Sequence, residues 1–156
     1  MAKITEASQG VQEFIQNVVM EMELDAFASF RYLSITNQKQ LVKVAKASPT
    51  HEYFIRTSDV VLVYVNEKVW DMLDDKSRAL LTRNALNGIS WNDEKGKMNV
   101  EQPELLISQG CYEAYGVDLV NAAEAVAFAL RQIKEQEKEA KASKQSKNKK
   151  WTPDQE

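Results

Sequence analysis

The feature that most constrains the fold of this chain is an apolar run over residues 59–65, which reads Asp-Val-Val-Leu-Val-Tyr-Val. β-Branched and aromatic residues favour strands, and unbroken apolar character, without alternation, predicts a central strand covered on both faces. Two further segments rich in strand formers, 30–35 and 41–47, precede this run and predict neighbouring strands. Pro49 ends the second of them, because proline cannot donate a hydrogen bond to a sheet.

Apolar residues at helical spacing predict helices on both sides of this strand. Apolar stripes extend over residues 8–24 and 76–89. A third helix is predicted over 103–115, and Asp118 begins a fourth whose apolar residues end at Ile133. The sequence therefore predicts an α+β fold, in which a small sheet of three to five strands is packed by helices and the C-terminus is helical.

The distribution of charge separates a body from a tail. Residues 1–130 hold 12 Lys and Arg against 18 Asp and Glu, a net charge of −6, whereas residues 131–156 hold eight against five, a net charge of +3. From about residue 140 the chain offers too little apolar surface to fold alone. A chain of 156 residues is long enough for one domain. We therefore expect a single domain over 1–140 and a disordered, flexible basic tail over 141–156.

Composition excludes several classes of protein. The single cysteine cannot form an internal disulfide framework, and the single histidine, His51, cannot form a two-histidine zinc site. With five glycines, the chain lacks a glycine-rich phosphate loop. No apolar run approaches the roughly 20 residues that span a bilayer, and the first residues lack the apolar core of a secretory signal. We expect no cofactor, no metal, no membrane association and a cytoplasmic location.

The segment that follows the central strand resembles a known family. Residues 65–73 read Val-Asn-Glu-Lys-Val-Trp-Asp-Met-Leu, and Asp-Asp-Lys-Ser-Arg-Ala-Leu-Leu then begins a helix. This order resembles the phage metallopeptidases, a zincin-like family carried by bacteriophages, over roughly residues 24–116. The resemblance implies a zincin-like fold for residues 1–140, a phage origin, and a place in the host cytoplasm or in the virion.

The chain departs from this family at its zinc motif. A His-Glu-Leu-x-His motif would align with the segment that begins at Asn84, so Asn84 and Gly88 stand in place of the two histidine ligands and Ala85 in place of the general base. Zinc needs two imidazoles on one helix face, and the carboxylate takes a proton from the metal-bound water. The resemblance therefore implies a scaffold without its metal and without a catalytic residue, which is a pseudo-metallopeptidase.

Aromatic and basic residues outside the expected core are candidates for contact with a partner. Trp91 follows the second helix, where it could cover the former metal cleft, and Trp151 lies in the tail with no core to join. Lysines in a flexible arm can neutralise phosphates without sequence preference. The candidate contact residues are Trp91, Trp151, Lys144, Lys147, Lys149 and Lys150.

Three functional hypotheses follow. The first is a catalytically inactive, phage-encoded protein that acts by binding a host or phage protein, in the infected host or in the virion. The second is an accessory protein that binds nucleic acid non-specifically through its basic tail. The third is an enzyme with an unusual active centre. Metal content distinguishes the third from the others, and salt-dependent binding to DNA or RNA distinguishes the second from the first.

Overall fold

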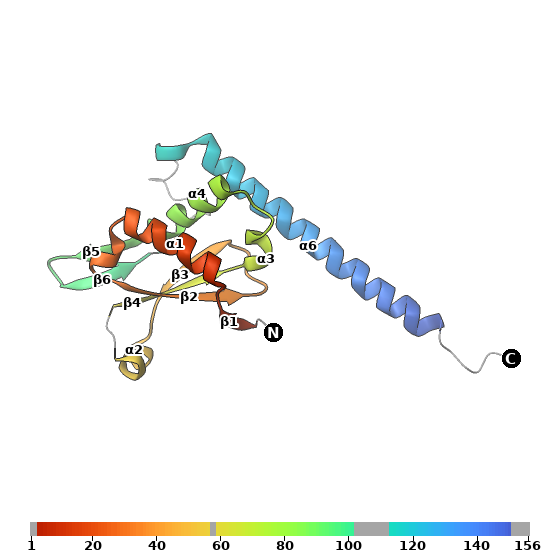
Figure 1. Ribbon diagram of the computed structural model, residues 1–156, viewed down its shortest axis with the longest axis horizontal. Coiled ribbons are helices and arrows are strands. Elements are labelled where there is room, and N and C mark those ends of the chain that lie inside the picture. Colours follow the sequence, from red (N-terminus) through yellow and green to blue (C-terminus); the bar gives the residue numbers. More distant parts are fainter. Residues whose placement is uncertain (1–2, 57–58, 102–112, 151–156) are drawn as a thin grey trace.

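A computed structural model describes residues 3–56, 59–101 and 113–150 of the chain. It confirms the predicted mixture of helices and strands: helices lie against a four-stranded sheet, and a two-stranded hairpin lies beside them (Figure 1). In the described ranges no helix has both the length and the apolar character needed to cross a membrane.

The central strand lies inside the sheet, as the sequence predicts. The sheet consists of β1 (Ile4–Glu6), β2 (Ser29–Ile35), β3 (Val42–Lys46) and β4 (Val60–Val65), in the order β1-β2-β4-β3. β4 pairs in parallel with β2 and antiparallel with β3. The apolar run therefore has a hydrogen-bonded neighbour along each edge.

The two faces of β4 differ in how well they are covered. Val61, Val63 and Val65 belong to the main core, whereas Leu62 and Tyr64, on the opposite face, are only half-buried. The prediction that both faces of this strand are covered is thus correct for the face with Val61, Val63 and Val65, and on the other face only Val60 is fully buried. An apolar run alone cannot distinguish complete cover from the partial burial that Leu62 and Tyr64 have here.

A layer of helices covers the valine face. It contains α1 (Gln9–Glu21), the short α3 (Glu67–Trp70) and α4 (Asp75–Leu86), and a 3₁₀ turn, η1 (Leu24–Ala26), follows α1. Apolar side chains from α1 and α4 join the strand valines in one core; those with no more than 5% exposure include Val11, Ile15, Val18, Val19 and Leu86. The amphipathic pattern of the sequence therefore points inward as expected.

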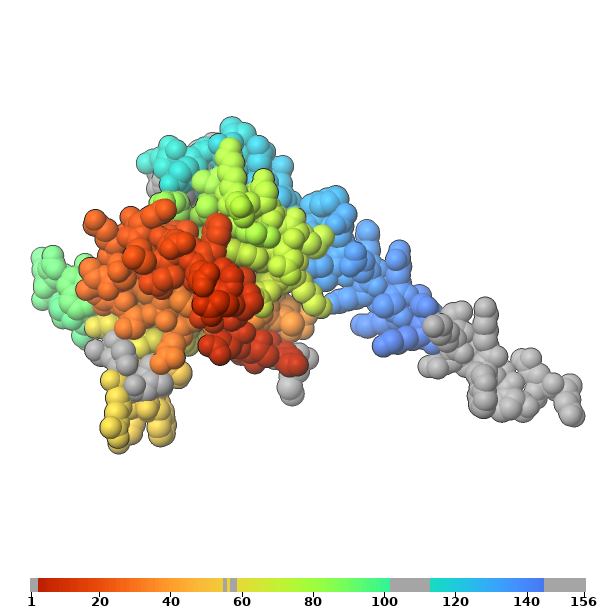
Figure 2. Space-filling model, in the orientation of Figure 1, coloured from red at the N-terminus to blue at the C-terminus, as the bar shows by residue number. Residues whose placement is uncertain are grey.

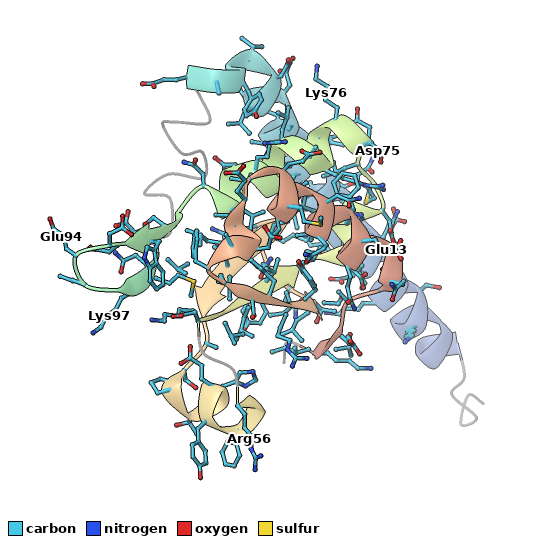
Figure 3. The ribbon with its side chains drawn as sticks, turned by 60° about the vertical axis from the view of Figure 1, so that its left-hand side comes forward. Glu13, Arg56, Asp75, Lys76, Glu94 and Lys97 are labelled. Carbon is cyan, nitrogen blue, oxygen red and sulfur yellow. The ribbon has the colours of Figure 1, made fainter. Side chains whose placement is uncertain are left out.

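A turn at residues 93–96 joins two short strands. β5 (Ile89–Asn92) and β6 (Lys97–Val100) pair antiparallel directly after α4. The backbone N–H of Glu101 donates to the carbonyl of Gly88 at 2.9 Å, which extends the pairing by one step. Glu94 and Lys97 lie at the outer end of this hairpin (Figure 3).

One helix was not predicted from the sequence. α2 (Pro49–Ile55) connects β3 to β4 and projects from the body of the molecule (Figures 1 and 2). The hydroxyl of Ser48 accepts from the backbone N–H of His51 at 3.2 Å, and Pro49 occupies the first turn. Serine followed by proline is a recognised helix start, so the signal was present but was interpreted only as the end of a strand.

The C-terminal helix is longer than expected. α6 (Val117–Lys150) packs against α4 and α3 near its beginning and then extends beyond the body (Figures 1 and 2). Residues 141–150, expected to be flexible, are helical here, and the predicted third helix lies mostly outside the described residues. Alanine, lysine and glutamine are strong helix formers, and adding residues to an existing helix avoids the cost of nucleation. The prediction considered apolar surface alone and therefore did not include helix propensity, which makes residues 141–150 helical.

Candidate functional site

Two of the positions at which the resemblance would place a zinc motif, Asn84 and Ala85, lie on the last turns of α4. Asn84 and Ala85 are both buried, and they stand between Leu81 and Leu86 in the same core. Among the described residues no group of three or more His, Cys, Asp and Glu side chains is arranged to hold a metal ion. An amide and a methyl group supply neither an imidazole nor a proton acceptor, so these two positions do not fit zinc.

At the third of these positions, Gly88, the backbone of Glu101 lies where a side chain would begin. A Cβ atom added to Gly88 would lie 1.9 Å from the carbonyl oxygen of Glu101, far inside van der Waals contact. The two residues are held there by the hydrogen bond that extends the β5–β6 pairing. No side chain fits at residue 88 in this arrangement, so a second ligand from this position would require the hairpin to move.

Trp91 lies on β5, the strand that begins directly after Gly88. Its ring centroid is 5.9 Å from that of Phe27, and the residue is 38% exposed. Trp91 is therefore partly accessible on β5, and its described ring neighbour belongs to the segment that follows η1. Trp70, by contrast, is buried and makes an edge-on contact with Phe14 at 5.2 Å between centroids.

The other predicted contact residues lie at the far end of the chain. Lys144 is exposed on the projecting part of α6. The backbone of Lys147, Lys149 and Lys150 continues the helix, and Trp151 lies outside the described residues. Of the predicted contact residues, the structure thus places one accessible lysine on α6 and one partly exposed tryptophan on β5, on separate elements.

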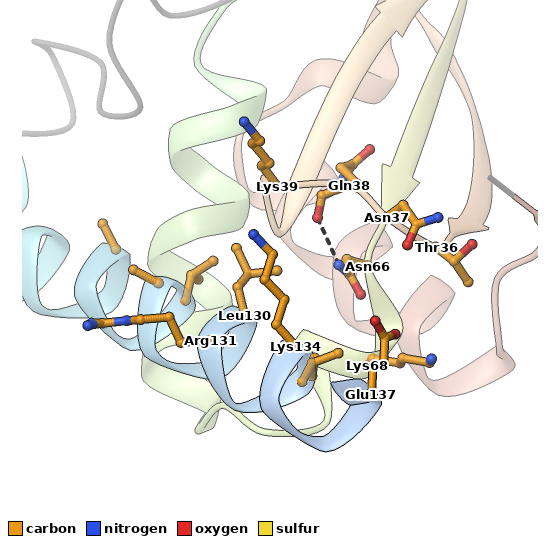
Figure 4. Close-up of a pocket in the computed structure, with 14 residues that line it drawn as sticks. Thr36, Asn37, Gln38, Lys39, Asn66, Lys68, Leu130, Arg131, Lys134 and Glu137 are labelled. Atoms are coloured by element: carbon orange, nitrogen blue, oxygen red, sulfur yellow. Dashed lines mark hydrogen bonds between the residues drawn. The ribbon is translucent and has the colours of Figure 1, made fainter. Parts of the chain in front are cut away.

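A groove that the sequence did not indicate lies between α6 and the turn at residues 36–39 (Figure 4). Its volume is about 590 Å³, within the range of ligand sites in proteins. Val126, Leu130 and Ile133 of α6 form its apolar floor, and Ala123 and Ala127 leave space beside them. Lining residues from Ala123 to Glu137 span about 20 Å of helix at 1.5 Å per residue. We call this feature the α6 groove.

The wall of the α6 groove opposite α6 is fixed by Asn66, a buried polar residue with 5% exposure. Its side-chain Nδ2 donates to the carbonyl of Gln38 at 2.8 Å, and its Oδ1 accepts from the N–H of Val69 at the start of α3 (Figure 4). The amide of Gln38 donates in turn to the carbonyls of Gln40 and Tyr64. These bonds join the turn, β4 and α3, so the wall is formed in advance of any ligand.

The charged residues along the groove are mostly cationic. Lys39 comes from the turn, Lys68 from α3, and Arg131 and Lys134 from α6, and Glu137 is the one acidic residue among the lining residues. All five are exposed, and across the described ranges none of the four cations makes an ion pair. The groove is thus an apolar surface with a positive rim, on a body whose net charge is negative.

The position of Lys68 is set by the residue before it. The Glu67 carboxylate accepts from the N–H of Ser8, at the start of α1, at 3.0 Å. Burial raises the pKa of Glu67, but hydrogen bonds from Ser8 and Ser34 lower it by more, so the pKa lies below its usual value. Glu67 is therefore ionised at neutral pH, and it holds α3 against α1 and β2.

A second hollow, of about 510 Å³, is lined mainly by β2 residues, with single residues from β1, α1, α2 and β4. Leu33 and Leu62 contribute apolar surface to it, and His51 of α2 lines one side. Its lining includes one carboxylate, Glu6, and one guanidinium, Arg31, which have opposite signs. The hollow therefore lacks the excess of positive charge that distinguishes the α6 groove.

Sequence reasoning missed the α6 groove because its walls come from distant segments. One signal was available on α6: Arg131, Lys134, Lys138 and Lys141 are spaced by three and four residues and lie on one side of a helix, next to the apolar stripe. The contributions of Lys39 and Lys68 are visible only in the folded chain.

Comparison of the chain with protein-family models gives no match, and comparisons with curated proteins and with solved structures give none either.

Proposed function

We propose that this protein is a catalytically inactive, metallopeptidase-like protein of phage type that functions as a protein-interaction module. The observation that carries the proposal is the α6 groove, which combines an apolar floor, a fixed wall and a rim of unpaired cations. Binding sites of this kind have an apolar centre and a polar rim. The resemblance of residues 24–116 to the phage metallopeptidases supplies the proposed origin, and the buried Asn84 and Ala85 support the loss of catalysis.

Two variants on α6 test the role of the groove in partner binding. Ala127→Trp places a large side chain in the groove at an exposed position, and Ala140→Trp makes the same change beyond the groove, where the helix is also exposed. We expect a partner from a lysate of the source organism to be captured by the wild-type protein and by Ala140→Trp, but not by Ala127→Trp. Equal capture by all three proteins would contradict binding through the groove.

The proposed loss of catalysis is tested separately. We expect the protein, purified without chelators, to contain no stoichiometric zinc, and we expect no hydrolysis of a fluorogenic casein substrate with or without added zinc. The reason is that Asn84, Ala85 and Gly88 provide neither ligands nor a general base. One zinc ion per chain that survives dialysis, together with cleavage, would overturn the proposal of an inactive scaffold.

A second candidate function is non-specific binding of nucleic acid. It is favoured by the exposed lysines of the projecting part of α6, Lys138, Lys141 and Lys144, which extend away from the acidic body. Such residues gain affinity by releasing counterions from phosphates, so binding must weaken as salt rises. Removal of residues 141–156 should then abolish retardation of a DNA fragment at low salt. Equal retardation by the shortened chain would exclude the tail as the binding element.

A further inference from the structure

The α6 groove offers two kinds of surface to the same ligand. Its apolar floor, from Ala123 to Ile133, covers about three helical turns, and its rim carries Lys39, Lys68, Arg131 and Lys134 from three separate segments. A ligand that fills the groove must therefore combine an apolar stripe with negative charge on both sides of that stripe. An acidic amphipathic helix has this distribution, since residues three and four apart share one face.

The charges of the groove favour an anionic ligand over a neutral one. Placing an uncharged helix in the groove would bring the rim cations close to apolar surface without a counter-charge, which costs free energy. Carboxylates at the edge of the ligand would pair with Lys134 on one side and with Lys39 on the other. Figure 4 shows Lys134 extending from α6 toward the turn that carries Lys39. Such complementarity sets partner choice and association rate more than total affinity.

The shape of the groove distinguishes a helix from other anions. The groove follows α6 for about 20 Å, which matches roughly 15 residues of a second helix. Among the described residues no aromatic side chain lines the groove, so nucleic-acid bases would find no described ring on which to stack. A single-headed amphiphile would engage one or two of four cations that are distributed along both walls.

We propose, building on the proposed interaction function, that the α6 groove binds an acidic amphipathic helix of a partner protein along α6. The apolar stripe of that helix packs on Val126, Leu130 and Ile133. Its flanking Asp or Glu residues pair with the cations of the rim. This is the helix-in-groove mode of recognition, in which apolar anchors supply affinity and charges supply selectivity.

Three synthetic peptides of about 15 residues test this chemistry with the full-length protein. Each has leucines at helical spacing, and the flanking positions carry Glu in the first, Gln in the second and Lys in the third. Glu, Gln and Lys have similar helix propensities, so the comparison isolates charge. By fluorescence anisotropy we expect the Glu peptide to bind about tenfold more tightly than the Gln peptide, and the Lys peptide to bind most weakly. The advantage of Glu should shrink as salt is raised from about 0.05 to about 0.5 M.

Matched variants place the binding in the groove. Lys134→Glu should reduce affinity for the Glu peptide about tenfold and improve binding of the Lys peptide, whereas Lys144→Glu, the same change beyond the groove, should do neither. Ala127→Trp should abolish binding, and Ala140→Trp should not. Because residues 127 and 134 are exposed, these variants are expected to fold, and circular dichroism checks that they do.

The outcomes separate this inference from the proposed function. Equal affinity for the Glu and Gln peptides, with loss in Ala127→Trp, would overturn the acidic partner but retain a binding groove. If no peptide binds and Ala127→Trp captures the same lysate proteins as the wild type, both proposals fail. Displacement of the Glu peptide by a DNA oligonucleotide or by oleate at similar concentration would show that the groove accepts any anion, and this too would overturn the inference.

Discussion

Helices α4 and α6 pack against each other but use their surfaces in opposite ways. α4 buries six of its 12 residues, and Gly88, two residues after the helix ends, is closely approached by the backbone of Glu101. α6 buries residues in its first turns, and its apolar stripe also lines the α6 groove before the helix extends beyond the body. α4 is thus mostly covered by its neighbours, whereas α6 lines an open groove.

The comparison shows how a scaffold can be filled at one place and opened at another. Asn84 and Ala85 are buried near the end of α4, because an empty cleft there would cost cavity energy. The groove beside α6 stays open because the turn at 36–39 is held by Asn66 and does not collapse onto the helix. Four predictions test the two sides of this comparison, from the largest expected effect to the smallest.

The closed side is tested most directly by Gly88→Ala. The added Cβ would lie 1.9 Å from the carbonyl oxygen of Glu101, so the hairpin must shift. Overpacking of this kind typically costs 1–3 kcal/mol, and we expect a loss of about 3 kcal/mol in the free energy of unfolding, measured by denaturant melts.

A matched control exists on α1. A Cβ added at Gly10 meets no atom within 4 Å, so Gly10→Ala should stabilise the protein by about 0.5–1 kcal/mol. If Gly88→Ala is also stabilising, the region beside α4 is open and the contrast between the two helices disappears.

The wall of the open side is tested by Asn66→Ala. The change removes the hydrogen bond to the Gln38 carbonyl and the cap of α3, and it leaves buried groups unpaired. We expect a loss of about 2 kcal/mol in the free energy of unfolding and weaker binding of the Glu peptide. Asn17→Ala, on an exposed position of α1, serves as the control and should change stability by less than about 0.5 kcal/mol. Unchanged peptide binding by Asn66→Ala would show that the wall is not set by this residue.

The contact between α1 and the sheet is tested by pH. Burial raises the pKa of Tyr32 to about 12, and its hydroxyl donates to the Oε1 of Gln16. In the unfolded chain this tyrosine loses its proton near pH 10, so between about pH 10 and 12 the folded state binds more protons and stability falls as pH rises. Tyr32→Phe should flatten this dependence and lower stability at pH 8 by about 1 kcal/mol. If the free energy of unfolding of Tyr32→Phe falls as steeply between about pH 10 and 12 as that of the wild type, Tyr32 is not the source of this pH dependence.

The projecting part of α6 is tested by removing residues 141–156. Residues 141–144 are exposed, so we expect Tm to fall by less than about 2 °C in thermal melts followed by circular dichroism. Helical signal should decrease in proportion to the residues lost from α6. A fall of several degrees would mean that this segment packs on the body, and the open side would then extend further than the α6 groove.

Much of the fold follows from local pattern. Val61, Val63 and Val65 predicted the central strand, and the apolar stripes predicted α1 and α4, because burial requires that apolar residues share a face at the period of the element. α2 was missed although Ser48 and Pro49 carry a helix-start signal. The helical state of residues 141–150 was missed because propensity, and not burial, determines it.

The sequence by itself determined that the chain has an α+β core and that residues 84, 85 and 88 are not zinc ligands. Only the tertiary structure decided that Gly88 is closed by the carbonyl of Glu101 and that Lys39, Lys68 and Lys134 face one groove. The physical reason is the distance along the sequence between the residues that interact. Strands and helices depend on side chains a few residues apart, whereas a cleft depends on backbone and charges that folding brings together from segments up to a hundred residues apart.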